Sequence, residues 1–266
     1  MIALATAAQD STTMIGRELK HTLRYPLMLV ASILVPVVFL LLFDYILGGP
    51  IGNGLGEAAR GAPYVDYLVP GILMMTIAAG SGNIAIGVCT DMREGIIDRF
   101  RTMAISRGAL LTGHVAGGVI RALVTTAVVT GVALLVGFRP HAGVLDWLVV
   151  AGIVAAFALA LAWLSVALGL VTKSIAGANG STLPIQFLLP FLSSAFVPTA
   201  SMPVGLRQFS EYEPFTPVTQ TVRGLLSGGP IATHAIPAIA WSVAIALASY
   251  LWAVRLYNRR RAATPS

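Results

Sequence analysis

Charge is scarce in this sequence. Only 11% of its 266 residues are charged, whereas 56% are hydrophobic, and the mean hydropathy is +0.83. A soluble domain carries about a quarter charged residues, and disordered chains are poor in apolar residues. Because this chain has too little polar surface to face water, its composition excludes both classes and predicts an integral membrane protein.

Cysteine and clustered metal ligands are scarce too. Cys89 is the only cysteine in the sequence, which excludes a disulfide framework and a thiolate metal cluster. The four histidines, at positions 21, 114, 141 and 234, lie in different segments, so no metal-ligand spacing occurs. The sequence also has no G-x-x-x-x-G-K-[ST] loop to hold the phosphates of ATP. We therefore expect no metal, no cofactor and no catalytic residue in this chain.

Long apolar stretches are what the sequence does have. Six of them are close to the ~20 residues that a helix needs to cross a bilayer. Most show no alternation of polar and apolar residues, which favours helices over strands. The predicted spans are residues 26–47, 67–89, 114–138, 146–171, 176–200 and 231–254. The predicted fold is one all-α integral membrane domain, residues 1–266, with six transmembrane helices.

Basic residues are unevenly distributed between the connecting segments. Twelve of the 17 lie in the N-terminal tail, in residues 90–113, at Lys173 and in the C-terminal tail, residues 255–266. Cytoplasmic loops are enriched in Lys and Arg. We therefore expect both termini in the cytoplasm. Because arginine outnumbers lysine 15 to 2, the composition suggests a bacterial source, and hence the inner or plasma membrane.

Residues 1–25 carry a basic amphipathic pattern. Ile15, Leu19 and Leu23 recur at every fourth position, whereas the basic residues of this tail fall on the opposite side. A helix of this kind lies in the headgroup plane of an anionic membrane. The pattern predicts an N-terminal interfacial helix, and a merely solvated leader is the alternative.

Residues 90–113, TDMREGIIDRFRTMAISRGALLTG, form the segment richest in mixed charge. Met92, Ile96, Phe100 and Met103 share one helical face, whereas charged residues cluster on the other. A short amphipathic helix on the cytoplasmic side is suited to docking in a groove of a partner protein. A solvated loop helix without a partner is the alternative.

Prolines are concentrated in and after the fifth predicted span. Proline removes a backbone donor and kinks a helix, which in lipid is tolerated only against protein or a water-lined cavity. We therefore predict a broken helix and a re-entrant extracellular hairpin over residues 201–230. The residues assigned to an extracellular gate are Pro198, Met202, Pro203, Pro214 and Pro217. A static cap on a dimer interface is the alternative.

Two blocks of the sequence carry a resemblance to a known family. The first is YLVPG at residues 67–71, followed by DMREGIIDRFRTM and ISRGALLTG. The second, residues 191–230, is FLSSAFVPTASMPVGLRQFSEYEPFTPVTQTVRGLLSGGP. With the six-span layout, they resemble the ABC-2 type permeases, in the daunorubicin-resistance-like drug exporter branch. The sequence departs from the family pattern in two places. Ala104 stands where the family usually has a proline, and Tyr212 and Glu213 stand where it usually has an Asn or Asp before the next proline.

The resemblance implies a half-transporter. Such permeases form dimers, with an identical or a paralogous copy, and pair with two separate ABC ATPase subunits that bind ATP and Mg. The resemblance also implies that ATP hydrolysis is transmitted through the cytoplasmic helix. The residues assigned to this coupling are Asp91, Arg93, Glu94, Gly95, Asp98, Arg99, Arg101 and Arg107. Membrane lipids are further expected partners, whereas nucleic acid is not.

Polar and adaptable apolar residues of spans two and five are available to line a central path. They are Met74, Met75, Asn83, Gln186, Phe187, Phe191 and Ser194. We expect an exporter of amphipathic drugs, antibiotics or lipids that works by alternating access. Export of a lipid-linked polysaccharide or envelope glycolipid is the alternative within the same fold. A membrane-embedded enzyme or a non-transporting scaffold are the rivals from other classes, but no intramembrane Ser/His, Asp/Asp or H-E-x-x-H set is present.

Overall fold

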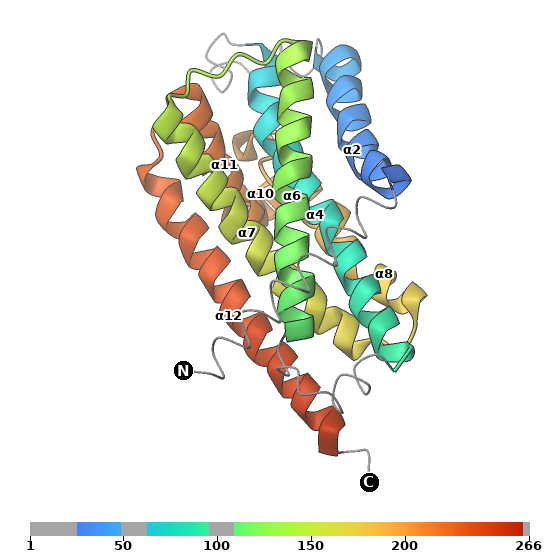
Figure 1. The fold of residues 1–266 in the computed structure, drawn as a ribbon. Coiled ribbons are helices and arrows are strands. Elements are labelled where there is room, and N and C mark those ends of the chain that lie inside the picture. Colours follow the sequence, from blue (N-terminus) through green and yellow to red (C-terminus); the bar gives the residue numbers. More distant parts are fainter. Residues whose placement is uncertain (1–25, 49–62, 96–108, 263–266) are drawn as a thin grey trace.

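The computed structural model describes residues 26–48, 63–95 and 109–262, and every regular element within these ranges is a helix (Figure 1). Four helices contain stretches long and apolar enough to cross a membrane. They are α4 (Tyr64–Arg93), α6 (Ala109–Val136), α7 (Val144–Val171) and α12 (Ala232–Ala262). The all-helical membrane fold predicted from the composition is confirmed, and the chain is a multi-pass membrane protein.

The first and fifth predicted spans correspond to composite helical runs. The helix α2 (Pro26–Leu41) continues into a π-helical turn, η1 (Leu42–Leu47). The fifth run joins α8 (Ile175–Leu183), the π-helix η3 (Pro184–Leu188) and α9 (Leu189–Leu192). Pro184 and Pro190 have no N–H group, so each leaves one backbone hydrogen bond of the helix unmade. The π-helical turn η3 lies where these hydrogen bonds are absent. As membrane spans, both runs stay predictions.

The fifth run is shorter than predicted. We expected a helix through residue 200, but the backbone of Ser193 is extended (φ −90°, ψ 178°) and ends the helix at Leu192. The four long helices are all longer than predicted, α4 and α12 most of all: α4 runs from Tyr64 to Arg93, and α12 continues beyond residue 254 to Ala262. A helix keeps its backbone hydrogen bonds after it leaves the hydrocarbon, so hydropathy underestimates its length. The predicted interfacial helix, residues 1–25, lies outside the described residues.

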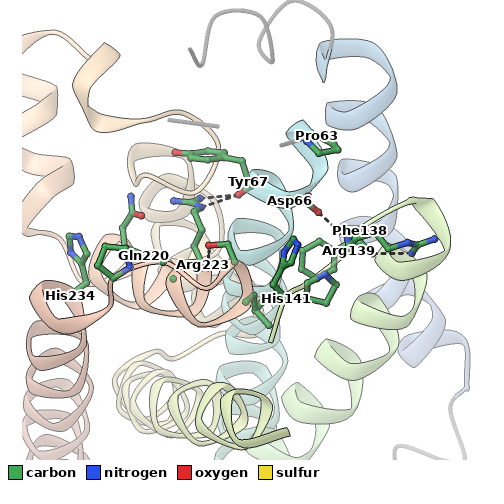
Figure 2. Close-up of a pocket in the computed structure, with 15 residues that line it drawn as sticks. Pro63, Asp66, Tyr67, Phe138, Arg139, His141, Gln220, Arg223 and His234 are labelled. Carbon is green, nitrogen blue, oxygen red and sulfur yellow. Dashed lines mark hydrogen bonds between the residues drawn. The ribbon is translucent and has the colours of Figure 1, made fainter. Parts of the chain in front are cut away.

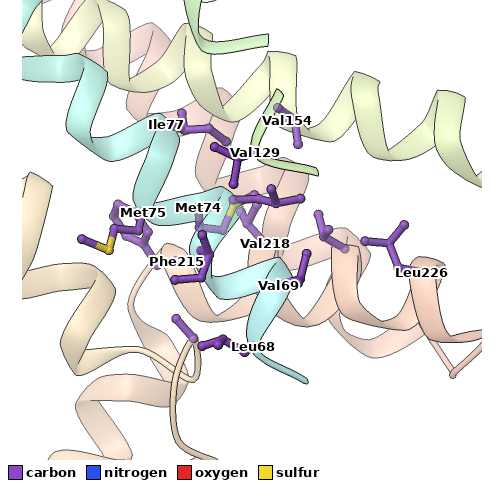
Figure 3. Packing of buried hydrophobic residues seen from close by; sticks show 14 of the residues in the cluster. Leu68, Val69, Met74, Met75, Ile77, Val129, Val154, Phe215, Val218 and Leu226 are labelled. Atoms are coloured by element: carbon purple, nitrogen blue, oxygen red, sulfur yellow. The ribbon is translucent and has the colours of Figure 1, made fainter. Parts of the chain in front are cut away.

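The helix α4 occupies the centre of the bundle. It packs against α2, α6, α7, α8 and α11 (Phe215–Ser227). Of the most apolar 18-residue stretch of α4, 72% is buried inside the protein, compared with 17% of the corresponding stretch of α12, which lies at the periphery. Figure 3 shows the core around α4, which includes Leu68, Val69, Met74, Met75, Ile77, Val129, Val154, Phe215, Val218 and Leu226. The outer faces carry exposed apolar side chains such as Leu34 and Leu247, as expected for contact with lipid.

Small residues allow α4 and α7 to approach closely. A Cβ atom added to Gly169 of α7 would lie 2.6 Å from the carbonyl oxygen of Ala85 on α4. Lipid tails are as apolar as leucine, so membrane helices associate through close packing and polar contacts rather than through the hydrophobic effect. Gly169 therefore fixes the separation of the two most central helices.

Three short helices follow the fifth run. They are the 3₁₀ turn η4 (Thr199–Ser201), α10 (Val204–Tyr212) and α11. The helix α11 is mostly buried and packs against α4, α7 and α12 at the upper end of the bundle in Figure 1. The sequence correctly predicted an interruption here. A re-entrant position in the membrane stays a prediction.

Candidate functional site

Arg223 of α11 contacts the first turns of α4. Its Nε and Nη2 atoms donate hydrogen bonds to the carbonyl oxygen of Tyr67 at 3.2 and 3.0 Å (Figure 2). Nη2 also donates to the carbonyl oxygens of Ser194, at 3.0 Å, and Ala195, at 3.3 Å. The guanidinium carbon lies 3.7 Å from the centre of the Tyr67 ring, within the range of a cation–π interaction. One cation therefore joins α4, α11 and residues 193–196.

Two tyrosines of α4 hold the same short segment. The hydroxyl of Tyr64 donates to the carbonyl oxygen of Phe196 at 3.2 Å, and the hydroxyl of Tyr67 donates to that of Ser194 at 3.0 Å. One turn further along α4, a Cβ atom on Gly71 would overlap the carbonyl group of Ala195, so the close approach requires glycine. We call Tyr64, Tyr67, Arg223 and residues 193–196 the outer clamp.

Glu213 connects the outer clamp to the start of α11. Its carboxylate is 5% exposed and accepts hydrogen bonds from the backbone N–H groups of Phe215 and Thr216. Burial raises the pKa of Glu213 to about 7, and the hydrogen bonds to the carboxylate offset this only in part. The Thr216 hydroxyl accepts the N–H of Ser194 at 2.9 Å, and Gln220 donates to the Ser194 hydroxyl at 3.1 Å. The polar face of α11 is therefore bound to Ser194.

A cavity of about 420 Å³ lies beside the outer clamp. Its walls come from the start of α4, the loop between α6 and α7, α11, and the start of α12 (Figure 2). The acidic and basic residues that line it are Asp66, Arg139, His141, Arg223 and His234, and Tyr67 lines it as well. We call it the outer cavity. Its volume lies within the range of small-molecule sites.

Hydrogen bonds fix the loop that forms one wall of the outer cavity. Asp66 accepts the backbone N–H of Arg139 at 3.1 Å. The Arg139 guanidinium donates to the carbonyl oxygens of Leu134, at 2.7 Å, and Phe138, at 3.0 Å, and so satisfies acceptors at the end of α6. The N–H of His141 donates to the carbonyl oxygen of Leu226 on α11 at 2.8 Å. The loop is therefore held against both α4 and α11.

The opposite end of α4 carries a second buried polar contact. Asp91, in the last turn of α4, is hydrogen-bonded to Nε2 of His114 on α6 at 2.8 Å, and both side chains are buried. The helix ends at Arg93, Glu94 follows as its cap, and Gly95 has φ 66°, a left-handed conformation that favours glycine. Asp91 therefore ties α4 to α6 at the base of the bundle.

This end of α4 corrects one prediction. We expected the amphipathic cytoplasmic helix to include Asp91 and Arg93, but both belong to α4, and the turn at Gly95 separates them from residues 96–103. The other residues assigned to coupling, Asp98, Arg99, Arg101 and Arg107, lie outside the described residues. The coupling role of the whole set stays a prediction.

The seven path residues lie in different environments. Met74 and Met75 are buried in the core, and Gln186 is buried with its Nε2 donating to the Thr182 hydroxyl at 2.7 Å. Asn83, Phe187 and Phe191 are exposed, whereas Ser194 belongs to the outer clamp. None of the seven lines the outer cavity. Their contact with a substrate stays a prediction.

The five gate residues mark the boundaries of the short helices. Pro198, Pro203 and Pro214 directly precede η4, α10 and α11, and Met202 follows η4. Pro217 lies in the first turn of α11. Proline is well accommodated at these positions because the first N–H groups of a helix have no partner within it. A gate function for these residues stays a prediction.

Sequence reasoning did not assign Tyr64, Tyr67 or Arg223 to a site. Tyr67 and Arg223 are 156 positions apart, so no local pattern connects them. One signal was present: Arg223 is one of only four basic residues in the connecting segments that the charge distribution predicts to lie outside the cytoplasm. A basic residue on that side, next to an apolar membrane domain, is a candidate for a specific contact.

The fold and these contacts define a multi-pass helical membrane protein whose central helix is held by polar contacts at both ends. The chain belongs to the ABC-2 type transporter family, which it matches over residues 10–227. This assignment confirms the resemblance seen in the sequence.

Relatives in several bacteria support the same assignment. The daunorubicin resistance ABC transporter permease protein DrrB1 of Streptomyces coeruleorubidus is 27% identical over 85% of this chain and 78% of its own length. The probable doxorubicin resistance ABC transporter permease protein DrrC of Mycobacterium tuberculosis is 24% identical over 86% of this chain and 81% of its own. The inner membrane transport permease YadH of Escherichia coli is 28% identical over 47% of this chain and 49% of its own. The chain is thus a transporter permease subunit and not an enzyme, and membership of the family implies association with an ABC ATPase subunit.

Proposed function

We propose that this permease is the transmembrane part of an ATP-driven exporter that moves amphipathic drugs or antibiotics out of the cell. Its similarity over 85% of the chain to a permease named for daunorubicin resistance is the observation that carries the proposal. ATP and Mg bind in two copies of a separate ATPase subunit. Two permease copies, identical or paralogous, surround the substrate and expose it alternately to the two sides of the membrane.

The geometry of α4 supports a route for coupling. Its 30 residues span about 45 Å, so one helix connects the segment assigned to ATPase contact with the outer clamp. The inner end is tied to α6 through Asp91 and His114, and the outer end to α11 through Arg223. In the proposed cycle, the ATPase displaces residues 90–113, α4 moves with them, and the outer clamp releases residues 193–196.

The character of the buried surface supports an amphipathic cargo. The core around α4 consists mainly of aliphatic, methionine and phenylalanine side chains, together with Tyr64 and Tyr67. Such surfaces accept bulky apolar molecules and offer no ring of charges of the kind that selects ions. Envelope lipids share this chemistry, and a lipid-linked glycan is the cargo to be compared with drugs in the test.

The test reconstitutes the permease in liposomes with the ATPase encoded beside it. We expect stable association, ATPase stimulation by daunorubicin, and ATP-dependent loss of the drug from the side that the ATPase occupies. Stimulation by a lipid-linked glycan alone would replace drugs as the cargo, whereas failure to bind any ATPase would overturn the exporter proposal.

Charge reversal at Glu94 tests the coupling assignment. Glu94 follows the last turn of α4 and is exposed. Glu94→Lys should abolish ATPase stimulation while the permease still inserts in the membrane and melts like the unmodified protein. Glu211→Lys, an equal charge change on the exposed face of α10, is the matched control and should retain stimulation. Normal transport by Glu94→Lys would refute the coupling role.

A further inference from the structure

Arg223 is held without a carboxylate partner. All four of its hydrogen bonds go to backbone carbonyl oxygens, and the remaining atom, Nη1, is buried with no hydrogen-bond partner within the part of the chain that the structure describes. Buried charges are normally paired with an opposite charge or fully hydrogen-bonded. Arg223 therefore lacks one acceptor and a compensating negative charge.

The acidic groups closest to this site along the chain are engaged elsewhere. Asp66, the one acidic residue among those that line the outer cavity, accepts the N–H of Arg139. Glu213 caps the start of α11, on the same helix as Arg223. Neither of these two carboxylates therefore pairs with Arg223.

The outer cavity has the charge and the size to bind an anion that compensates the charge of Arg223. Arg223 lines it together with Arg139, His141 and His234, and Asp66 is the one acidic residue among the lining residues; the Arg139 guanidinium itself is bonded to Leu134 and Phe138. Cationic and N–H donor groups around a cleft attract anions, and a guanidinium binds phosphate or carboxylate oxygens strongly. A volume of about 420 Å³ accommodates a head group larger than a water molecule.

We propose that the outer cavity binds the anionic head of an amphiphile, a phosphate or a carboxylate, which is attracted by the charge of Arg223 and by the imidazoles of His141 and His234 on the cavity wall. A membrane phospholipid and a soluble anion offer the same chemistry. None of the predicted path residues lines this cavity, although Ser194 is hydrogen-bonded to Arg223 and Gln220 on its wall. The inference does not depend on ATP-driven export, because binding requires only this permease.

The binding test uses the full chain purified in a neutral detergent. Three probes are titrated by calorimetry: dihexanoyl phosphatidylglycerol, its zwitterionic phosphatidylcholine counterpart, and inorganic phosphate. We expect the phosphatidylglycerol to bind and to raise the melting temperature. The phosphatidylcholine keeps the phosphate but adds a choline cation, which the basic lining repels, so it should bind at least about tenfold more weakly. Binding of inorganic phosphate as well would identify a general anion site, and its absence a lipid head-group site. Equal binding of the two lipids, or binding of no anion, would overturn the proposal.

A substitution that supplies the missing charge internally sharpens the test. Gln220 precedes Arg223 by three positions on α11 and lines the same cavity, so a carboxylate there can reach the guanidinium. Gln220→Glu should weaken phosphatidylglycerol binding by about tenfold or more without lowering the melting temperature. The matched control, Gln208→Glu, makes the same charge change at an exposed position on α10 and should bind normally.

A second variant tests the cavity at a residue outside the outer clamp, where a substitution should not disturb local folding. His234 lies at the start of α12, outside the outer clamp, and lines the cavity. His234→Ala should lower affinity about threefold or more, as expected for one lost donor. Unchanged affinity in both Gln220→Glu and His234→Ala would contradict the assignment.

Discussion

Replacing Arg223 by methionine should loosen the outer clamp by a measurable amount. The change keeps a long apolar stem and removes four hydrogen bonds and the contact with the Tyr67 ring. Interhelical hydrogen bonds in membrane proteins average about 0.6 kcal/mol each, and a cation–π contact adds about 0.5–2 kcal/mol. Removing the guanidinium also removes the cost of burying it, which offsets part of this loss. We therefore expect Arg223→Met to lower the free energy of unfolding by about 3 kcal/mol.

The assay is thermal unfolding in a neutral detergent, followed by tryptophan fluorescence. A loss of about 3 kcal/mol corresponds to a fall in melting temperature of roughly 6–12 °C for a chain of this size. The control is Arg207→Met, which removes an exposed arginine whose ion pair with Glu211 joins successive turns of α10. Exposed pairs of this kind contribute about 0.5 kcal/mol or less. The reasoning is refuted if Arg223→Met melts like the unmodified protein, or if both variants lose equal stability.

Two further predictions concern the titration of Glu213 and the Asp91–His114 contact at the other end of α4. Burial raises the pKa of Glu213 from 4.5 to about 7. The folded state therefore holds a proton that the unfolded state releases, and the stability from this group is full below pH 4.5 and is lost as the pH rises through about 7. That loss amounts to about 3 kcal/mol, so the melting temperature of the unmodified protein should fall across this window, whereas that of Glu213→Gln should fall less; identical pH profiles would contradict the shift. At the other end, a double-mutant cycle of Asp91→Ala and His114→Ala should give a coupling energy of about 1–3 kcal/mol in thermal unfolding, because the pair is buried at 2.8 Å; additive effects would show that the contact is not energetically significant.

The sequence predicted the class of fold because lipid imposes strong rules on composition. Four of the six predicted spans coincide with helices long enough to cross a membrane. The ends of these helices were less accurate: α4 and α12 extend to Arg93 and Ala262 through polar residues. Hydropathy reports which residues favour hydrocarbon, whereas helix length depends on backbone hydrogen bonds and caps. The fifth run ends early because of backbone geometry at Ser193, which its apolar neighbours do not reveal.

Contacts between distant residues account for most of what the sequence did not predict. The residues quoted for the family resemblance include Tyr67 and Arg223, but their pairing depends on α11 folding back against α4. The amphipathic helix predicted from Asp91 onward does not begin where we expected, because Asp91 and Met92 belong to α4, and residues 96–103 lie outside the described residues. Periodicity continued through Gly95, yet this glycine adopts a left-handed conformation and ends the turn. Apolar periodicity alone does not distinguish a continuing helix from one that a glycine interrupts.

The placement of polar contacts bears on how such a bundle changes conformation. Apolar side chains gain little by facing each other rather than lipid, so they discriminate weakly between helix arrangements. The outer clamp does discriminate, because Arg223 satisfies three carbonyl oxygens only when α4, α11 and residues 193–196 are together. Arg223 also lines the outer cavity. An anion that binds the proposed site more tightly in the clamped arrangement opposes the opening of the outer clamp. Opening of the clamp then lowers the affinity for the anion by the same factor, since coupling between two equilibria is reciprocal. The outer cavity and the movement proposed for export are thus linked through one side chain.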